Sequence, residues 1–147
     1  ASAVVIIDAL AKTSVGLKLA SALLDLSGGL LLPTMFFTML TAIILGMGVP
    51  TTANYVITST IAAPALVQMG IPILAAHMFV FYFGIIADVT PPVALAAYAG
   101  SAISGGNALK TGVNASKLAI AAFLIPYIFV ASPVLLMIDA TPGALLA

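Results

Sequence analysis

Long apolar runs separated by short polar segments dominate the chain. Residues 26–87, 89–109 and 118–138 contain no Asp or Lys, and the sequence has no Arg or Glu at all. Uninterrupted apolar runs of about 18 residues or more are candidates for membrane-spanning helices. The pattern predicts an all-α integral membrane protein. Its helices are expected over these apolar stretches: 30–46, 52–69, 72–87, 91–103 and 113–138. The glycines and Lys110 in 104–112 predict a loop there, and Asn114 is the expected cap of the last helix.

Residues 13–25 have a different pattern, in which Lys18 and Asp25 alternate with leucines. This spacing predicts an amphipathic helix that lies at the membrane interface. It belongs to an N-terminal segment, 1–29, which ends at a pair of glycines. The first residues contain neither Met nor the charged, apolar and small-residue order of a signal peptide. We therefore expect a piece of a longer protein.

Composition narrows the class of protein further. The chain is 63% hydrophobic and 5% charged, whereas about a quarter of the residues of a soluble domain are charged. Four lysines balance four aspartates, so nothing in the charge indicates a nucleic-acid partner. Cysteine is absent from the sequence, which excludes disulfides, thiolate metal sites and a cysteine nucleophile. The lipid bilayer is the partner that this composition indicates.

Asp88 and the pair Pro91–Pro92 interrupt an otherwise apolar stretch. At ~1.5 Å per residue, 72–87 reaches about 24 Å and 91–103 about 20 Å, whereas a hydrocarbon core is about 30 Å thick. Together the two pieces predict one discontinuous helix over 72–103, with its break at 88–92 near the middle of the bilayer. Thr90 is expected to cap the second piece and Pro91 to begin it. A surface loop with a solvated Asp88 is the alternative.

A second break is expected at 46–52, which reads GMGVPTT. It divides 30–69 into two arms and is either a connecting turn or the tip of a hairpin that enters the membrane and returns. Irregular backbone at membrane depth is tolerated only inside protein or beside a water-filled cavity. Many transporters use such interrupted helices to build ion and substrate sites.

Three single residues stand out as candidates. Asp88 is an intramembrane carboxylate and thus a functional candidate by default, although it could serve only to accept backbone N–H bonds. His77 lies about 16 Å along the same helix, so we expect an interfacial residue or one that forms an inter-helix hydrogen bond, rather than a partner of Asp88. Asn54 could reach into a site or cap its own backbone. Hydroxyls on one face of the first arm either hold helices together or line a path: Thr34, Thr38 and Thr41.

Three stretches taken together resemble the C-terminal part of the large membrane subunit, the permease, of tripartite ATP-independent periplasmic (TRAP) transporters. They are GMGVPTTANYVI at 46–57, the segment 63–105, and FLIPYIFVASPVLL at 123–136. The resemblance covers roughly residues 13–140. The tail through Thr141 and Pro142 is more similar to the fused permeases of the TAXI subgroup.

The resemblance implies a fold that is half of an inverted-repeat elevator transporter, similar to the ion-transporter superfamily. In that fold 30–69 is a re-entrant helical hairpin with its tip at 46–52. Residues 72–103 form a broken transmembrane helix, and 113–138 form the helix that follows it.

The resemblance also implies a function. Such a permease takes up small organic acid anions with a sodium gradient, or with protons as the alternative, in a bacterial or archaeal inner membrane. It is no enzyme and needs no cofactor beyond the coupling ion. Its implied partners are an extracytoplasmic solute-binding protein, the remainder of the permease, and a small membrane subunit or fused segment.

Site residues follow from the resemblance at matching positions only. The coupling cation would be held by Gly46, Gly48, Pro50, Thr51, Thr52, Asp88, Thr90 and Pro91. The substrate would be held by Asn54, Thr90 and Pro92.

Two other classes of protein compete with a transporter. An intramembrane enzyme could use Asp88, but such chemistry needs a second acid, a metal cluster or an activated nucleophile nearby. A structural membrane subunit without a site is the other alternative. Two breaks that each contain Pro and Thr argue against it, since a scaffold gains nothing from interrupted helices.

Overall fold

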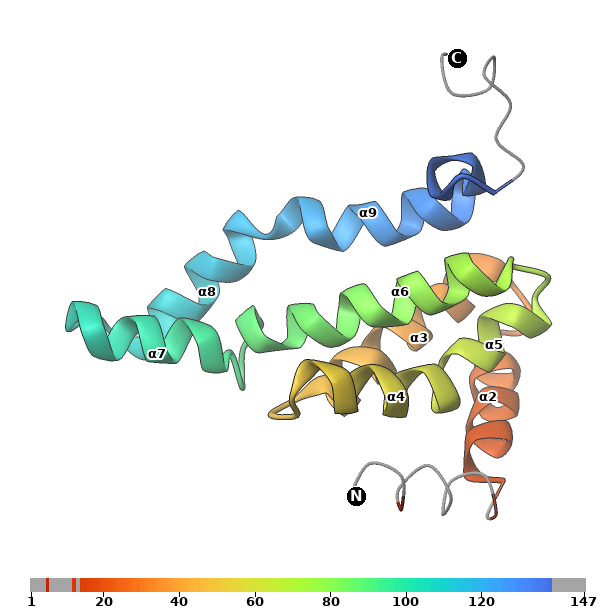
Figure 1. The fold of residues 1–147 in the computed structure, drawn as a ribbon, viewed down its shortest axis with the longest axis horizontal. Helices are drawn as coiled ribbons and strands as arrows, with labels where there is room; N and C mark the ends of the chain where they lie inside the picture. Colours follow the sequence, from red (N-terminus) through yellow and green to blue (C-terminus); the bar gives the residue numbers. More distant parts are fainter. Residues whose placement is uncertain (1–4, 6–11, 13, 139–147) are drawn as a thin grey trace.

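The computed structural model describes residues 5, 12 and 14–138, and within these ranges every regular element is a helix (Figure 1). The elements in chain order are α2 (Val15–Leu26), α3 (Leu31–Gly46), α4 (Thr51–Ile61), α5 (Ala63–Gln68), α6 (Ile73–Ile86), the 3₁₀ turn η1 (Ala87–Val89), α7 (Leu95–Ser104), α8 (Ala108–Leu118), α9 (Ile120–Ala131) and the 3₁₀ turn η2 (Pro133–Leu136).

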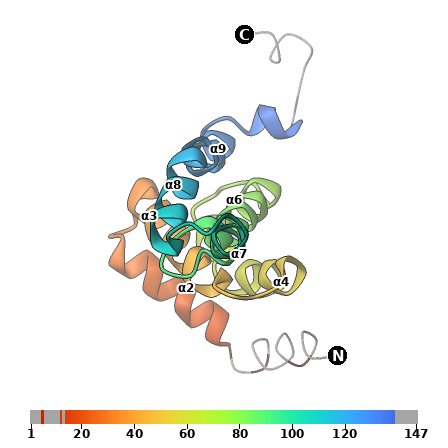
Figure 2. The ribbon, with the colours of Figure 1, turned by 90° about the vertical axis from the view of Figure 1, so that its left-hand side faces the viewer.

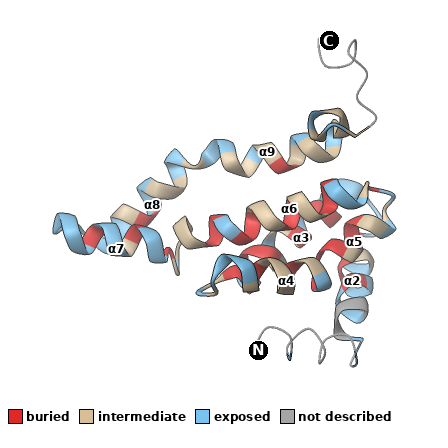
Figure 3. Cartoon of the chain, viewed as in Figure 1, coloured by how far each residue is buried: buried red, intermediate tan, exposed pale blue. Residues whose placement is uncertain are grey.

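Helix α6 is the centre of the bundle. It is apolar on all sides, which is typical of a helix surrounded by others, and it packs against α3, α4, α5 and α9. Phe79 and Phe83 on α6 are fully buried, with ring centroids 4.9 Å apart, and both contact the ring of Tyr127 on α9. Buried residues gather on α3, α4 and α6, whereas most of α7 and α8 is exposed and α9 is mostly a mixture of intermediate and exposed residues (Figure 3).

The first predicted arm is confirmed as α3, but the second arm is not one helix. A single helix over 52–69 was the expectation, and the chain instead bends at Ala62, between α4 and α5. Pro64 lies in the first turn of α5. Proline has no N–H to donate to the preceding turn and clashes with it. Pro64 therefore explains why the second arm is two helices rather than one.

The interruption between α6 and α7 is confirmed, but its predicted details are wrong. Helix α7 begins at Leu95 and not at Pro91, and its N-cap is Ala94, with a left-handed φ of 38°. Each residue that precedes a proline is disfavoured in helical geometry, so two consecutive prolines delay the helix. Thr90 does not cap α7, because its hydroxyl donates to the carbonyl of Ile86 at 2.7 Å and so closes α6.

The last helix begins earlier and ends earlier than expected. Asn107, and not Asn114, is its N-cap, since the Asn107 side chain accepts from the backbone N–H of Lys110 at 3.0 Å. The predicted loop at 104–112 shrinks accordingly. Helix α9 ends at Ala131 rather than near Ile138, where Ser132 and Pro133 lead into η2.

Helices α8 and α9 run back alongside α7 and α6 (Figures 1 and 2). Together they make the 24-residue stretch Ala108–Ala131, which within the described ranges is the one helix long and apolar enough to cross a membrane. Shorter apolar helices cover Leu31–Gly46, Ile73–Val89 and Leu95–Ser104. This set fits spans that are interrupted rather than continuous.

The predicted N-terminal helix is present as α2. Leu23 is buried against α5, while Lys18 and Asp25 are exposed, so the helix has one apolar and one polar face. Its place at a membrane interface stays a prediction. Thr141 and Pro142, on which the TAXI interpretation depends, lie outside the described residues, as does most of 1–13.

Candidate functional site

The two breaks in the helices lie against each other. Gly46 is the last residue of α3, and a methyl group placed on it would lie 2.6 Å from the carbonyl oxygen of Gly84 on α6 and 3.1 Å from Cβ of Ala87. The end of the α3–α4 hairpin therefore touches the end of α6 where η1 begins. Figure 1 shows the α3–α4 loop at the same end of the bundle as the α6–α7 junction.

Asn54 occupies the contact between these elements. Its side chain is 2% exposed, and a methyl group on Gly84 would lie 2.8 Å from both terminal atoms of its amide. The amide is thus held between α4, α3 and α6, where only glycines leave room for it. Asn54 does not cap its helix, since no side-chain hydrogen bond caps the start of α4. Its backbone N–H donates to the carbonyl of Pro50 in the ordinary helical way.

The Asn54 side-chain oxygen has no hydrogen-bond partner among the described residues. A buried acceptor left unpaired costs about 1–3 kcal/mol, so this oxygen is a favourable place for a ligand donor or a cation. The only other such atom in that part of the chain is the hydroxyl of Thr38, which lies two turns before Gly46 on α3.

The other predicted residues of the hairpin tip face outward. Gly48 adopts a left-handed φ of 72°, which suits glycine and lets the chain turn between α3 and α4. Pro50 caps α4, and Thr51 and Thr52 begin it with exposed side chains. Within the described chain, no hydrogen bond joins these hydroxyls to the break at 88–92. The structure brings Gly46 and Asn54 to the end of α6, at Gly84 and Ala87, just before that break, and it leaves the two threonines exposed.

At the facing break, Asp88 is half-buried in η1. Its carboxylate accepts no backbone N–H bond from any described residue, which argues against a purely structural role for it. The Thr90 hydroxyl is engaged with Ile86, Pro91 lines a groove against α8, and Pro92 is exposed. The Pro92 carbonyl accepts a hydrogen bond from the Tyr98 hydroxyl at 2.7 Å.

Helix α8 also shapes the break, and the sequence interpretation did not include it. The Ser116 hydroxyl donates to the carbonyl of Val89 at 3.0 Å. One turn earlier, a methyl group on Gly112 would lie 3.2 Å from Cβ of Ala94 and 3.3 Å from Cγ of Pro91. Small residues four apart let helices approach closely in membranes. In the sequence, the spacing of Gly112 and Ser116 could have indicated that α8 packs closely against the break.

The expected inter-helix hydrogen bond of His77 is confirmed. Its Nδ1 atom and the Tyr55 hydroxyl on α4 are 2.9 Å apart, and the Tyr55 ring also packs edge-on against Phe81. This contact ties the second arm of the hairpin to α6, far from Asp88. A catalytic pair between His77 and Asp88 has no support from this geometry.

Substituting Tyr55→Phe is expected to lower the stability of the purified permease by about 0.5–1.5 kcal/mol, the usual net worth of one hydrogen bond. The phenyl ring keeps its packing, so only the bond to His77 is lost. Tyr82→Phe is the matched control, because within the described residues the Tyr82 ring packs on Phe129 without a hydrogen bond. Thermal unfolding of both variants in detergent measures the difference, and equal midpoints would contradict the expectation.

Oxygen atoms dominate the chemistry of this site. The described residues contain no group of three or more His, Cys, Asp and Glu side chains that could hold a metal ion. Instead the breaks offer hydroxyls, one carboxylate, an unpaired amide oxygen and the carbonyls of helix ends. Helix ends and unwound carbonyls of this kind hold monovalent cations in transporters.

Helices interrupted where they meet, in a chain this apolar, define a membrane transport protein. The chain belongs to the family described as "Tripartite ATP-independent periplasmic transporter, DctM component", whose sequence model matches residues 1–144. No curated protein and no solved structure matches the chain. The family match confirms the resemblance to a TRAP permease and makes the chain part of a transporter rather than a member of an enzyme family.

Proposed function

We propose that this chain is the part of a TRAP permease that takes up small organic acid anions with a sodium gradient. The observation that carries the proposal is the contact between the two breaks at Gly46, Asn54 and Gly84. It places an unpaired amide oxygen and the Asp88 carboxylate at neighbouring helix ends. A cation held between two interrupted helices would couple their movement to the sodium gradient.

The proposed cation ligands come from both breaks. The carbonyls of Gly46, Gly48 and Pro50 and the hydroxyls of Thr51 and Thr52 form the hairpin half. Asp88, Thr90 and Pro91 form the half that belongs to the broken helix. Oxygen donors of this kind suit sodium, and the carboxylate of Asp88 would serve a proton in the alternative coupling.

The proposed substrate contacts are Asn54, Thr90 and Pro92, of which Thr90 and Pro92 lie just before the start of α7. The N-terminal amides of a helix carry partial positive charge and favour anions. Because α7 begins at Leu95, this positive end lies a turn beyond the two prolines. A small carboxylate would lie between it and the amide of Asn54.

The remaining parts of the proposal concern the whole transporter. The α3–α4 hairpin would be re-entrant and would move with the broken helix as an elevator in a cell inner membrane. An extracytoplasmic binding protein would deliver the solute. The remainder of the permease and a small membrane subunit, or a fused segment, would complete the site. The contact between hairpin and broken helix supports this, because it makes them one packed unit.

Sodium-dependent uptake into proteoliposomes tests the proposal, with the complete permease and its binding protein. Asp88→Asn and Thr51→Ala are each expected to raise the sodium concentration for half-maximal uptake by about tenfold or more. That change corresponds to the loss of an interaction with a charged group worth ~1.5–3 kcal/mol. Asp25→Asn and Thr60→Ala are matched controls, since both side chains are exposed, on α2 and α4.

Normal uptake with unchanged sodium dependence in both site variants would overturn the cation site at these breaks. Loss of a pH-driven component in Asp88→Asn, with sodium dependence intact, would show coupling to protons instead. Equal losses in the site variants and their controls would indicate damaged folding and contradict a specific role.

A further inference from the structure

Helix α8 carries a polar face that the proposed transport site does not use. Lys110, Asn114 and Lys117 follow one another at spacings of four and three residues, so they share one face of the helix, and all three are exposed. With Leu109 and Val113 they surround a hollow of about 320 Å³. The lining of this hollow is partly polar, whereas three other hollows formed by the described residues are almost entirely apolar.

The two lysines are not neutralised by neighbours. No acidic residue occurs between 89 and 138 in the sequence, and the described residues form no ion pair with Lys110 or Lys117. Both lie at the beginning of a stretch, 118–138, that has no charge at all. The face therefore carries a charge of about +2 that no ion pair neutralises. It lies near η1, which contacts α8 and holds Asp88, the one acidic residue between 26 and 138.

The length of the helix places this face near the membrane boundary. Ala108–Ala131 has 24 residues, which at ~1.5 Å per residue is about 36 Å and exceeds the ~30 Å of a hydrocarbon core. The excess of about 6 Å corresponds to about four residues at the start of α8, because α9 is apolar throughout. Lys110 therefore lies at the boundary, and Lys117 lies about 8 Å deeper. A lysine at this boundary extends its ammonium group toward the headgroups while its stem stays on apolar surface.

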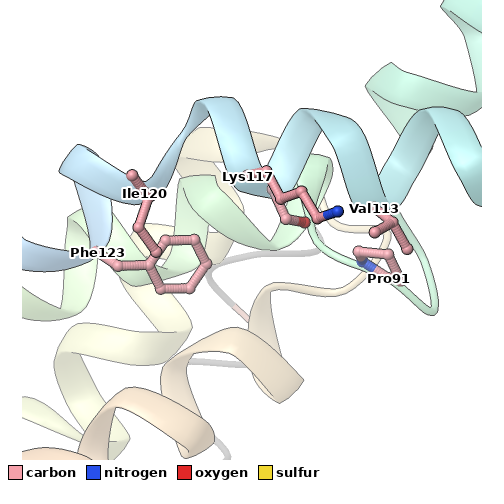
Figure 4. Close-up of a pocket in the computed structure, with 6 residues that line it drawn as sticks. Pro91, Val113, Lys117, Ile120 and Phe123 are labelled. Carbon is pink, nitrogen blue, oxygen red and sulfur yellow. The ribbon is translucent and has the colours of Figure 1, made fainter.

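An apolar groove of about 300 Å³ adjoins the polar hollow. Its lining is Pro91, Val113, Ser116, Lys117, Ile120 and Phe123, so the two hollows share Val113 and Lys117. Figure 4 shows Lys117 between Val113 and Ile120 along the helix, with Pro91 on the facing loop and Phe123 further along. A ligand that fills both hollows has an anionic head and an apolar tail.

We propose that this face of α8 is a binding site for an anionic phospholipid. Lys110, Asn114 and Lys117 hold the phosphoryl group, and an acyl chain lies in the groove that ends at Phe123. Inorganic phosphate matches only the polar hollow and leaves the apolar groove unfilled. Cationic groups at a membrane surface attract anionic headgroups by about 1 kcal/mol each, which selects an anionic over a zwitterionic lipid.

Lipid titration of the complete permease in detergent tests the site, with bound lipid measured by native mass spectrometry. The probes are phosphatidylglycerol and phosphatidylcholine with identical acyl chains. Wild-type permease is expected to prefer phosphatidylglycerol. Lys110→Gln and Lys117→Gln should each lower that preference about fivefold, and the double variant about 30-fold. Phe123→Ala should weaken both lipids equally, because the groove surface that it removes is common to both acyl chains. It also removes the ring contact with Phe83, so thermal unfolding of this variant is measured alongside.

Two controls separate charge recognition from damage. Lys18→Gln removes an exposed lysine from α2 and should leave the preference unchanged. Lys117→Arg keeps the charge and should restore most of the binding. An unchanged preference in the double variant would overturn the proposal. So would full displacement of phosphatidylglycerol by millimolar inorganic phosphate, since that result would mark a phosphate site rather than a lipid site.

Discussion

Gly46→Ala is expected to separate the α3–α4 hairpin from the broken helix and to abolish most transport. The added methyl group would lie 2.6 Å from the carbonyl oxygen of Gly84 and 2.9 Å from Nδ2 of Asn54. The nearest atom belongs to the backbone, so one helix must move to make room. Inserting a methyl group into a well-packed contact costs about 1–3 kcal/mol. Thermal unfolding of the purified permease and uptake into proteoliposomes measure the two effects.

Gly100→Ala is the matched control for this prediction. Gly100 lies within α7, and a methyl group there meets no atom within 4 Å. Alanine is favoured over glycine in a helix by ~1 kcal/mol, so the control should unfold at the same or a higher temperature. If Gly46→Ala and Gly100→Ala behave alike, the contact between hairpin and broken helix is not tight.

Combining Asn54→Ala with each glycine variant shows whether the added methyl group meets the Asn54 side chain alone or the backbone as well. A methyl group on Gly84 would meet only the amide of Asn54 among its three nearest atoms, whereas one on Gly46 would also meet backbone. The double variant Gly84→Ala/Asn54→Ala should therefore recover stability relative to Gly84→Ala. The double variant Gly46→Ala/Asn54→Ala should not. Recovery in both would mean that the Asn54 side chain alone makes the contact tight.

Gly112→Val is expected to have the second largest effect, because it forces α8 away from the break. A single methyl group at Gly112 already lies 3.2–3.4 Å from Ala94, Pro91 and Tyr98, and valine adds two methyl groups beyond it. The displacement would also break the hydrogen bond from Ser116 to Val89. We expect a loss of about 1–3 kcal/mol and a matching fall in uptake.

Ala121→Val is the control for Gly112→Val. Ala121 is exposed on α9, so this change introduces the same β-branched side chain into a helix without filling a contact. Ser116→Ala completes the set, since it removes the hydroxyl and leaves α8 free to stay in place. A Gly112→Val protein as stable and active as Ala121→Val would show that α8 does not hold the break.

Hydrophobic runs and prolines predicted most of the elements. The charge-free runs indicated the helices of the bundle, and Gly46–Thr52 and Asp88–Pro92 marked both interruptions. The predicted helix boundaries were wrong where two local effects on the backbone competed. Thr90 has the side chain of a helix cap, but the two prolines after it hold the backbone outside helical geometry until Ala94. Asn107 and Asn114 are equivalent in sequence, and only the fold shows which one begins α8.

The candidate site was only partly predictable from the sequence. Hydroxyls and a carboxylate at the breaks indicated a cation site, because such groups are costly in an apolar segment unless they have a role. The burial of Asn54 between two glycines depends on how α3, α4 and α6 pack, which local patterns do not show. The contact of α8 with the break was also missed, although the spacing of Gly112 and Ser116 was a local sign of a close approach. The contact of α8 with Val89 joins residues 27 positions apart in the chain.

The hydrogen bond between Ser116 and Val89 also links the depth of the break in the membrane to the depth of α8. Its two atoms are 3.0 Å apart, so the interrupted backbone lies at the same level along the membrane normal as Ser116, beside Lys117. A probe attached at residue 117 and quenched from known depths would thus measure the level of the break as well. A shallow reading, which the lipid site proposed on α8 requires, would place the break near the membrane surface. It would then not lie at the middle of the bilayer, where the lengths of its two arms predict it.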